Sequence, residues 1–248
     1  MAKESGLGAQ LYLDEYDISN DTGSVGSISK AVNLLTMTGI DKSAVERRAG
    51  QLTGSINANV FWNPSNAHLA LAAGARTDRI ASYYHRATLG APVASMVCKQ
   101  TTYAPNRDSA GLFTATTDTL SNAYWLDWGL ALTAGMRTDT AATNGTGVDF
   151  ADYGMPASFG LQAYLHVKAF TGTSATIKLQ GSSDNGVGDA FADITGGSFT
   201  TVTSVGKERI QTGRTQAIER YMRVVTTGTF SNLVFAVQAT VNIADYTI

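Results

Sequence analysis

The side chains of this sequence that could do chemistry are few and widely separated. There are three histidines, His68, His85 and His166, and a single cysteine, Cys98. One cysteine allows no intramolecular disulfide and no site built from several thiolates. His166 falls at a polar position of an alternating segment, where we expect a solvated or interface side chain rather than a metal ligand. These residues therefore predict no metal centre and no Cys/His nucleophile pair.

A group of oxygen-bearing side chains lies close together in the sequence: Asp184, Asn185, Asp189 and Asp193. Their spacing does not fit the ligand pattern of an EF-hand calcium loop. The residues Asp-Asn-Gly at 184–186 are instead typical of a tight turn with positive φ angles. We therefore predict a turn here and no metal.

A glycosidase would need two paired carboxylates. The candidates outside the acidic turns are Asp14, Glu15 and Asp127, and no pattern pairs them. Tyr83-Tyr84 and the aromatic-rich segment 123–128 could form a sugar platform, but such residues more often pack in a core or at a subunit contact. The sequence also lacks a Gly-x-Ser-x-Gly elbow, a phosphate-cradling loop and a dinucleotide fingerprint. We predict that the protein is not an enzyme and has no catalytic, cofactor-binding or metal-binding residues.

The charge balance argues against a protein that grips nucleic acid. The 248 residues include 18 Lys and Arg and 20 Asp and Glu, which gives a formal net charge of -2. The densest basic positions, such as Arg47-Arg48, lie beside acidic ones such as Glu46, whereas phosphate binding requires a basic stripe. Charged residues make up only 15% of the chain, against roughly 25% in typical proteins. Few charges and 25 glycines favour an assembly subunit whose surface is partly covered by other copies.

Alternation with a period of two predicts mostly β-strands, bounded by Gly, Asn and Asp turns. The predicted strands are 25–40 (one or two short strands), 52–62, 79–86, 91–100, 112–120, 123–133, 199–203, 217–225 and 233–243. A short helix is predicted over residues 43–49, because Asp41 can cap its start and Gly50 its end. A second is predicted over residues 67–73, closed by Gly74, with a loop of a single turn as the alternative.

The segment from 159 to 194 is predicted to be the scaffold of the second half. Residues 161–169 and 175–180 both alternate, and Thr-Gly-Thr-Ser at 171–174 reads as the turn of an antiparallel hairpin. The last strand, 233–243, has a wholly apolar odd face. Short strands separated by turns predict an antiparallel β-sandwich or barrel.

The domain organisation follows from these patterns. We predict an N-terminal β region with short helices over 1–134, a long loop or linker over 135–156, and a C-terminal antiparallel β region over 157–248; the two regions could equally form one continuous domain. Residues 1–8 lack the apolar core of a signal peptide, and no run approaches the roughly 20 apolar residues of a membrane span. Synthesis in the cytosol is therefore expected.

A further set of segments in the first half is Tyr-Asp-Ile-Ser-Asn-Asp at 16–21, Thr-Gly-Ile-Asp-Lys-Ser-Ala at 38–44 with Glu46-Arg47, and residues 68–70, 76–78, 82–84, 90–92 and Tyr103. Together these segments resemble tail tube, or major tail, proteins of long-tailed bacteriophages. In the second half, residues 163–167, 176–186 and 220–224 are similar to β-sandwich segments of phage virion proteins.

This resemblance implies a mainly β fold of tail-tube type, an antiparallel β-sandwich or barrel with one or two short helices. It implies a structural virion protein of the phage tail, made in the host cytoplasm. Its partners would be itself, as homo-hexameric rings stacked into a tube, and other tail proteins, with no membrane. DNA would pass through the lumen without specific binding, which a sequence pI of about 5.9 suits. The alternatives are a phage head decoration or fibre protein, or a carbohydrate-binding β-sandwich module.

Two segments with weak periodicity are expected at subunit contacts. They are the N-terminal arm, 1–23, and the loop 135–156, both rich in Gly, Asp and Thr. A segment that becomes ordered on docking suits a contact between rings. We therefore expect both segments to be mobile in the free monomer.

Overall fold

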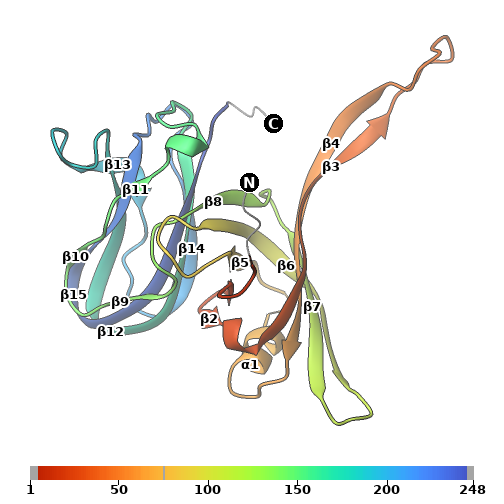
Figure 1. Ribbon diagram of the computed structural model, residues 1–248, viewed down its shortest axis with the longest axis horizontal. Coiled ribbons are helices and arrows are strands. Elements are labelled where there is room, and N and C mark those ends of the chain that lie inside the picture. The colour runs from red at the N-terminus through yellow and green to blue at the C-terminus, as the bar shows by residue number, and fades with distance from the viewer. Residues whose placement is uncertain (1–4, 75, 245–248) are drawn as a thin grey trace. The chain divides into compact units, whose positions relative to one another are not determined.

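The computed structural model describes residues 5–74 and 76–244, which form two compact units (Figure 1). Unit 1 takes in residues 5–20, 82–95 and 127–244, and unit 2 takes in 21–74, 76–81 and 96–126. The described residues are mostly antiparallel strands with a single α-helix, so the prediction of a mainly β fold is confirmed. The chain enters and leaves each unit more than once, and the division at 134 and 156 stays a prediction about independently folding domains.

Unit 1 is built on two long strands, β12 (Leu161–Ser182) and β15 (Tyr221–Val241). They pair antiparallel along their whole length, from Leu161 opposite Val241 to Ser182 opposite Tyr221. The strands that pair with β12 on its other edge are β13 (Ala192–Ser198) and β14 (Gly206–Gln211). Those that pair with β15 are β8 (Asp127–Ala131), β9 (Arg137–Asp139), β10 (Thr143–Asn144) and β11 (Val148–Asp149).

The N-terminal hairpin of β1 (Gln10–Leu13) and β2 (Tyr16–Asp17) also belongs to unit 1. It is followed in the sheet by β5 (Arg79–Tyr84) and β6 (Pro92–Arg107), each of which runs from one unit into the other. Leu11, Tyr12 and Leu13 are buried, so the described part of the N-terminal arm belongs to the fold. Residues 1–4 of that arm lie outside the described residues.

The hairpin predicted around 171–174 is wrong. Strand β12 continues through these residues, and the register against β15 shifts at three places between Val167 and Ser174. Such bulges bend a strand without ending it, and here β15 supplies a partner on both sides of the bend. The segments 217–225 and 233–243 likewise fall in one strand, β15, which starts at Tyr221. The turn at 184–186 is confirmed, because Asn185 and Gly186 have φ angles of 63° and 82°.

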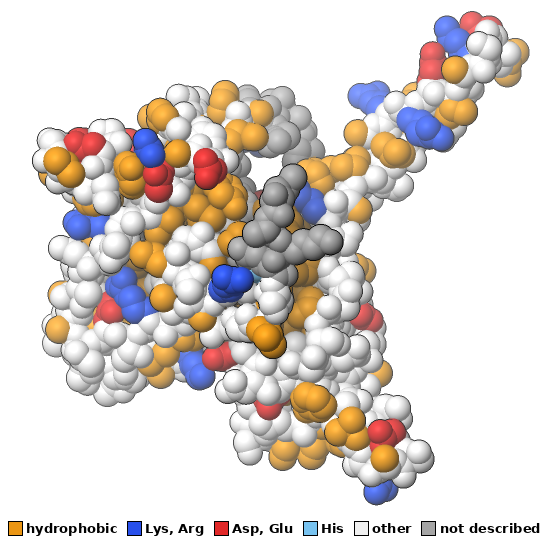
Figure 2. All heavy atoms as spheres, viewed as in Figure 1, with side chains coloured by type: hydrophobic (Ala, Val, Ile, Leu, Met, Phe, Trp, Pro, Cys, Tyr) orange, Lys and Arg blue, Asp and Glu red, His pale blue; other side chains and the backbone are white. Residues whose placement is uncertain are grey.

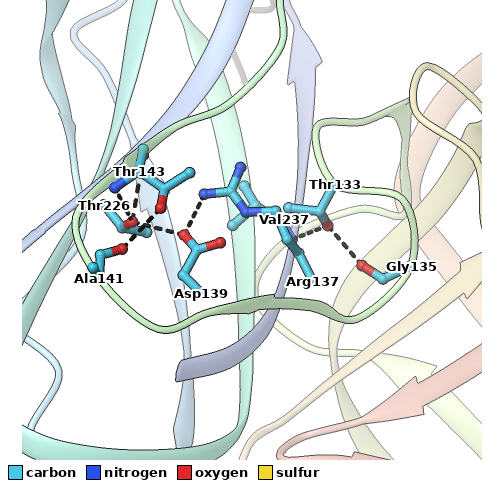
Figure 3. Close-up of polar contacts among 8 residues, drawn as sticks. All are labelled: Thr133, Gly135, Arg137, Asp139, Ala141, Thr143, Thr226 and Val237. Carbon is cyan, nitrogen blue, oxygen red and sulfur yellow. Dashed lines mark hydrogen bonds and ion pairs between the residues drawn. The ribbon is translucent and has the colours of Figure 1, made fainter. Parts of the chain in front are cut away.

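Residues 135–156 form three short strands on β15 and a 3-10 turn, η2 (Ala151–Tyr153), rather than a structureless loop. Figure 3 shows how the start of this segment is attached: the Asp139 carboxylate accepts from Arg137 Nη2 at 2.6 Å and from Thr226 Oγ1 at 2.7 Å. Further along, Val148 and Phe150 are buried in the core. The strands within 135–156 are too short to show a period-two pattern in the sequence. They form because β15 provides their backbone hydrogen-bond partners.

The core of unit 1 lies between the long pair and the segments that cover it. Its members include the apolar odd positions of β12 and β15, as the alternation predicts: Leu161, Ala163, Leu165, Val167, Leu233, Phe235, Val237 and Ala239. The even positions at the start of β12 are buried as well, since all seven residues 161–167 are buried. Strand β12 therefore has two covered faces, and the expectation of one solvated face is wrong there.

Unit 2 contains an antiparallel sheet in the order β3 (Thr22–Thr36), β4 (Arg47–Phe61), β7 (Phe113–Ser121) and the second part of β6. The even positions of β4, from Gly54 to Val60, are buried on one face. Helix α1 (Ala67–Ala72) is tied to β6, because the buried Gln100 Nε2 donates to the Leu71 carbonyl at 2.8 Å. No helix in the described part of the chain has the length and apolar character needed to cross a membrane.

The helix predicted over 43–49 is wrong, and the one predicted over 67–73 is confirmed as α1. Arg47 begins β4, where Arg47 and Arg48 pair with the end of β3. A seven-residue helix is only marginally stable on its own. The backbone hydrogen bonds between β3 and β4 therefore form here in place of the predicted capped helix. Gly74 follows α1 for a packing reason: a Cβ there would lie 2.2 Å from the Arg79 guanidinium. The predicted strand 199–203 is reduced to one bridge, between Val202 and Ala175.

Candidate assembly surfaces

A serine and a histidine lie in hydrogen-bond contact inside unit 1. His166 Nε2 is 2.7 Å from Ser82 Oγ, and Ser82 Oγ is 2.6 Å from Ser95 Oγ. The other ring nitrogen, Nδ1, is 2.6 Å from the Asp14 carbonyl oxygen. All three side chains are fully buried, and this burial lowers the pKa of His166 from 6.5 to about 4. A substrate has no access to the pair, so this network holds β1, β5, β6 and β12 together.

The position of His166 corrects the sequence prediction of a solvated or interface side chain. The alternation of β12 is real, but its even face is covered by segments distant in sequence, including the turn after β1. The other two histidines lie elsewhere: His68 is on α1, and His85 is in the connection between β5 and β6. Cys98 is buried in β6.

The carboxylates considered for acid–base chemistry are already engaged. Asp127 accepts from the buried Tyr164 hydroxyl at 2.6 Å, and Asp14 pairs with Lys207 at 2.7 Å. Both residues are less than a tenth exposed. Glu15 lies in the turn between β1 and β2. These contacts give the carboxylates structural partners, and none of them joins two carboxyl groups across an open cleft.

The acidic residues between 184 and 193 are held by the turn itself. The Asp184 carboxylate accepts from the backbone N–H groups of Gly186, Val187 and Gly188 at 2.6–3.1 Å, which lowers its pKa. Asp193 is bound by Lys178 Nζ at 2.6 Å. In the described ranges, no three or more His, Cys, Asp or Glu side chains are grouped so that they could hold a metal ion.

The aromatic residues considered as a sugar platform are divided between core and surface. Tyr84 is fully buried against Tyr12, with ring centroids 4.9 Å apart. The Trp125 indole N–H donates to a backbone carbonyl in unit 2, and the Lys30 ammonium lies 4.2 Å from the centre of its ring. Trp128 keeps 40% of its surface exposed. No shared platform results from these placements within the described residues.

The sheet of unit 2 has one face made mostly of uncharged polar side chains, which we call the polar face. Its residues are Ser24, Ser27, Ser29, Ser55, Asn57, Asn59, Phe61, Lys99, Thr102, Ala104, Asn106, Thr114, Thr116, Asp118 and Leu120. The strand register arranges them in rows, for example Ser24, Asn59, Thr116 and Ala104. They alternate along β4 with the buried positions of the opposite face.

The polar face carries little fixed charge. Its ionisable members are Asp118 and Lys99, and the Lys99 ammonium pairs with Asp78 at 2.8 Å. Its amides and hydroxyls bond to one another: Thr116 Oγ1 donates to Asn59 Oδ1 at 3.0 Å, and Asn59 Nδ2 donates to Ser24 Oγ at 3.4 Å. A surface with few cations releases few counterions from a polyanion, so it has little affinity for DNA. The uncharged character of these positions of β4 can be read from the sequence, because the polar positions of the alternating segment 52–62 are Ser and Asn rather than charged residues.

Strand β3 forms an edge of this sheet, since among the described strands it is hydrogen-bonded to β4 alone. It is 15 residues long, and most of it is exposed. A long edge strand presents a row of unpaired backbone N–H and C=O groups, which is a template for another strand. At the other side of the sheet, residues 102–107 of β6 pair with β7 and are exposed or half-buried.

The β3–β4 hairpin extends beyond the four-stranded part as a two-stranded arm, residues 32–48. Strand β7 pairs with β4 only from Ser55 onward, and every residue of the arm is exposed. Its large apolar side chains are 38–110% exposed: Val32, Leu34, Leu35, Met37, Ile40 and Val45. Figure 2 shows hydrophobic side chains spaced along the arm to its tip. The sequence predicts the first five of these residues as apolar positions of the strands within 25–40, and it places Val45 in the predicted helix 43–49.

A second apolar surface, the aromatic patch, lies at the opposite end of β4 from the arm. It consists of Trp62, Leu69 and Phe113, each 36–49% exposed. The Trp62 and Phe113 rings meet edge to face at 5.0 Å. Beside them, His68 Nδ1 is 2.6 Å from the Tyr103 hydroxyl, so His68 supports the patch.

No protein-family model matches the chain, and no curated protein matches it in sequence. Among solved structures, the fold is similar to a chain of the virion of a native gene transfer agent particle, with 13% identity and a TM-score of 0.40 over 51% of this chain and 98% of that one. It is also similar to the Dit protein of phage SPP1, described as a hub adsorption apparatus protein, with 10% identity and a TM-score of 0.33 over 94% of this chain and 99% of that one. At these scores neither likeness carries an inference about function.

Proposed function

We propose that the chain is a structural subunit of a bacteriophage tail tube, in which the sheets of unit 2 stand side by side as the wall of a DNA conduit. The observation that carries the proposal is the combination, on one sheet, of a mostly uncharged polar face and a long free edge. The resemblance of the sequence to tail tube proteins supports the same role. The subunit would form homo-hexameric rings that stack, and other tail proteins would be its partners at the ends of the tube.

The free edge of β3 supplies the lateral contact. Its unpaired backbone groups would hydrogen-bond to the exposed part of β6, residues 102–107, in the next copy. Adding a strand to a sheet edge uses backbone groups that every copy presents in the same register. Because the two edges differ, the contact is heterologous, and such contacts close into a ring when the rotation between copies permits.

The polar face would line the lumen. A duplex that leaves through the tube passes each ring, so attractive contacts to its phosphates would hold it back. Hydroxyl and amide groups that already bond to one another, as Thr116, Asn59 and Ser24 do, offer DNA a hydrated surface with few cations. DNA would therefore pass without specific binding.

The role asks for no reaction, and the placement of the reactive groups agrees with it. The Ser82–His166 pair is fully buried, and Asp14 and Asp127 are engaged in internal contacts. We propose that the subunit catalyses no reaction and that its function rests on shape and self-association.

Negative-stain microscopy and hydrogen exchange of the purified chain test the proposal together. We expect rings or tubes at high concentration. We also expect the β3 amides that point away from β4 to exchange fast in dilute monomer and slowly in the assembly. Strand β14, whose one pairing partner within residues 5–74 and 76–244 is β12, is a matched internal control whose exchange should not change. A chain that stays monomeric, or an assembly in which β3 remains as exposed as β14, would overturn the proposal.

A further inference from the structure

Lys99 is the one cation among the described residues of the polar face. Its backbone lies on β6, in the row of Ser55 and Leu120. Its ammonium lies 2.8 Å from the Asp78 carboxylate and donates to the Arg76 carbonyl oxygen at 3.1 Å. Both partners belong to the connection between α1 and β5, which is not one of the strands of this face. The cation of the face is therefore paired with a carboxylate from a neighbouring segment.

The Asp78 carboxylate is itself held in place. Asn122 Nδ2 donates to its Oδ1 atom at 2.8 Å, and this is the oxygen that Lys99 approaches. The Asn122 backbone N–H donates in turn to the Val97 carbonyl oxygen on β6 at 2.9 Å. The Lys99 and Asp78 side chains are 40% and 54% exposed, and an ion pair this exposed adds little to stability. The main effect of the pair is on the local charge.

The pairing removes the attraction that a free ammonium would have for a phosphate. The two charges of the pair are 2.8 Å apart, which is far less than the Debye length of about 8–10 Å, so a phosphate meets a dipole rather than a cation. If Lys99 left Asp78 to bind a phosphate, the DNA would release a counterion, but the bared carboxylate would take one up. The net release of counterions, which drives binding to DNA, would then be lost.

We infer that Asp78 keeps the polar face from binding DNA, because it holds the Lys99 ammonium in an ion pair. This inference rests on the proposed function, in which the polar face lines the conduit, and it names the residue that lets the duplex pass the one cation of that face. Asp78 acts through Lys99 and needs no contact with DNA. It is therefore a positioning residue.

The variant Asp78→Asn tests the inference, because it removes the charge and keeps an oxygen that can accept from Asn122. We expect the assembled variant to bind a fluorescently labelled duplex more tightly than the wild type, as measured by anisotropy. Each Lys99 that reaches a phosphate should steepen the dependence of log affinity on log salt by about 0.9. Between about 50 and 200 mM salt, that slope lowers the affinity by a further factor of about three to four for each contact.

A second substitution separates the role of Lys99 from the loss of a negative charge. The double variant Asp78→Asn with Lys99→Gln should return to the affinity and salt dependence of the wild type. A gain that persists without Lys99 would contradict the inference. The matched control is Asp193→Asn, which removes the carboxylate from another exposed pair, with Lys178 at 2.6 Å in unit 1, and should not change the affinity for DNA.

Moving the cation tests the inference with Asp78 and the net charge unchanged. The variant Lys99→Gln with Ser55→Lys places the ammonium two strands along the same row, about 10 Å away and therefore about one Debye length from its former place. It should bind DNA as Asp78→Asn does, and it decides the question if Asp78→Asn does not fold. If the variants assemble but bind DNA no better than the wild type, the inference is wrong and the proposed function stands. A wild type that forms no rings, or that itself binds DNA tightly, overturns the proposed function.

Discussion

Mild acid should destabilise this protein through His166. Above pH 6.5 the imidazole is neutral in both the folded and the unfolded chain. Below that pH the unfolded chain binds a proton, whereas the folded chain does so only near pH 4, because burial opposes the charge. Stability is therefore lost as the pH falls from 6.5 to about 4, and the loss levels off below that.

The size of this effect follows from the two pKa values. At about 1.36 kcal/mol per pH unit, the gap between 6.5 and about 4 corresponds to about 3 kcal/mol, most of which is reached at pH 4.5. The groups that face the ring have opposing effects: hydrogen bonding to Asp14 favours the proton, and Lys207 opposes it. A loss of this size is a large share of the roughly 5–15 kcal/mol that stabilises a typical domain.

Urea unfolding at pH 7.5 and pH 4.5, followed by circular dichroism, measures this effect. Between these pH values the wild type should lose about 2–3 kcal/mol more than His166→Gln, which cannot take up the proton. His85→Gln, which changes a histidine outside the buried network, should behave as the wild type does. If wild type and His166→Gln lose the same stability over this range, His166 does not resist protonation in the fold, and the reasoning is refuted.

Three further predictions concern packing and charge. Arg79→Met should lower the free energy of unfolding by about 2 kcal/mol or more, because the buried Gln100 Oε1 loses the guanidinium that donates to it at 2.6 Å. Gly129→Ala should weaken the pairing of β8 with β15, since a Cβ there would lie 2.1 Å from a carbonyl oxygen of β15, and thermal melting measures the loss. Asn57→Arg with Thr116→Arg should give assembled protein a salt-sensitive affinity for duplex DNA that the wild type lacks.

Each of these three has a matched control and a contrary result. Arg76→Met is the control for Arg79→Met, because Arg76 is exposed. Gly213→Ala is the control for Gly129→Ala, because a Cβ at Gly213 would contact no other atom. Both control variants should keep the stability of the wild type. Unaltered melting of the Arg79 or Gly129 variant would show that the contact is not needed. For the polar face, Thr173→Arg with Thr229→Arg adds equal charge to unit 1. If that control binds DNA as strongly as the polar-face variant, the position of the charge is irrelevant.

The sequence predicts those elements whose determinants are local. The odd face of 233–243 became the buried face of β15, and the helix after Asn66 and the turn at 184–186 formed where the residue types require them. A strand with a clear apolar face and a turn with Asn-Gly chemistry need no information from distant residues. The mainly β class followed from the sum of such signals.

The sequence predictions are wrong where contacts with segments distant in the sequence determine the local structure. Thr-Gly-Thr-Ser at 171–174 can turn or bulge, and β15 selects the bulge by pairing with both flanks. The helix pattern at 43–49 competes with pairing to the end of β3, which no local window contains. His166 is buried because the turn at Asp14 and the hydroxyl of Ser82 cover it from far along the chain.

The candidate surfaces could not be predicted from the pattern of apolar residues alone. Apolar residues such as Leu34 and Ile40 carry the same pattern whether they fill the chain's own core or cover a partner, and only the fold shows them exposed. The polar positions of β4 could have been predicted from the sequence, because Ser55, Asn57 and Asn59 alternate with buried residues. That they form one continuous face with residues of β3 and β7 follows only from the strand register.

The uncharged character of the polar face suits a closed wall better than an acidic face would. Acidic side chains would repel DNA, but neighbouring strands lie only about 4.8 Å apart, and like charges directly opposite one another destabilise a sheet. In the proposed ring, every acidic position would recur in each copy around the lumen, so the repulsion would oppose lateral assembly. Ser, Thr and Asn avoid attraction to phosphate and repulsion between copies at once. The single carboxylate, Asp118, lies opposite Asn57 and Thr102, so no second charge faces it within the subunit's sheet.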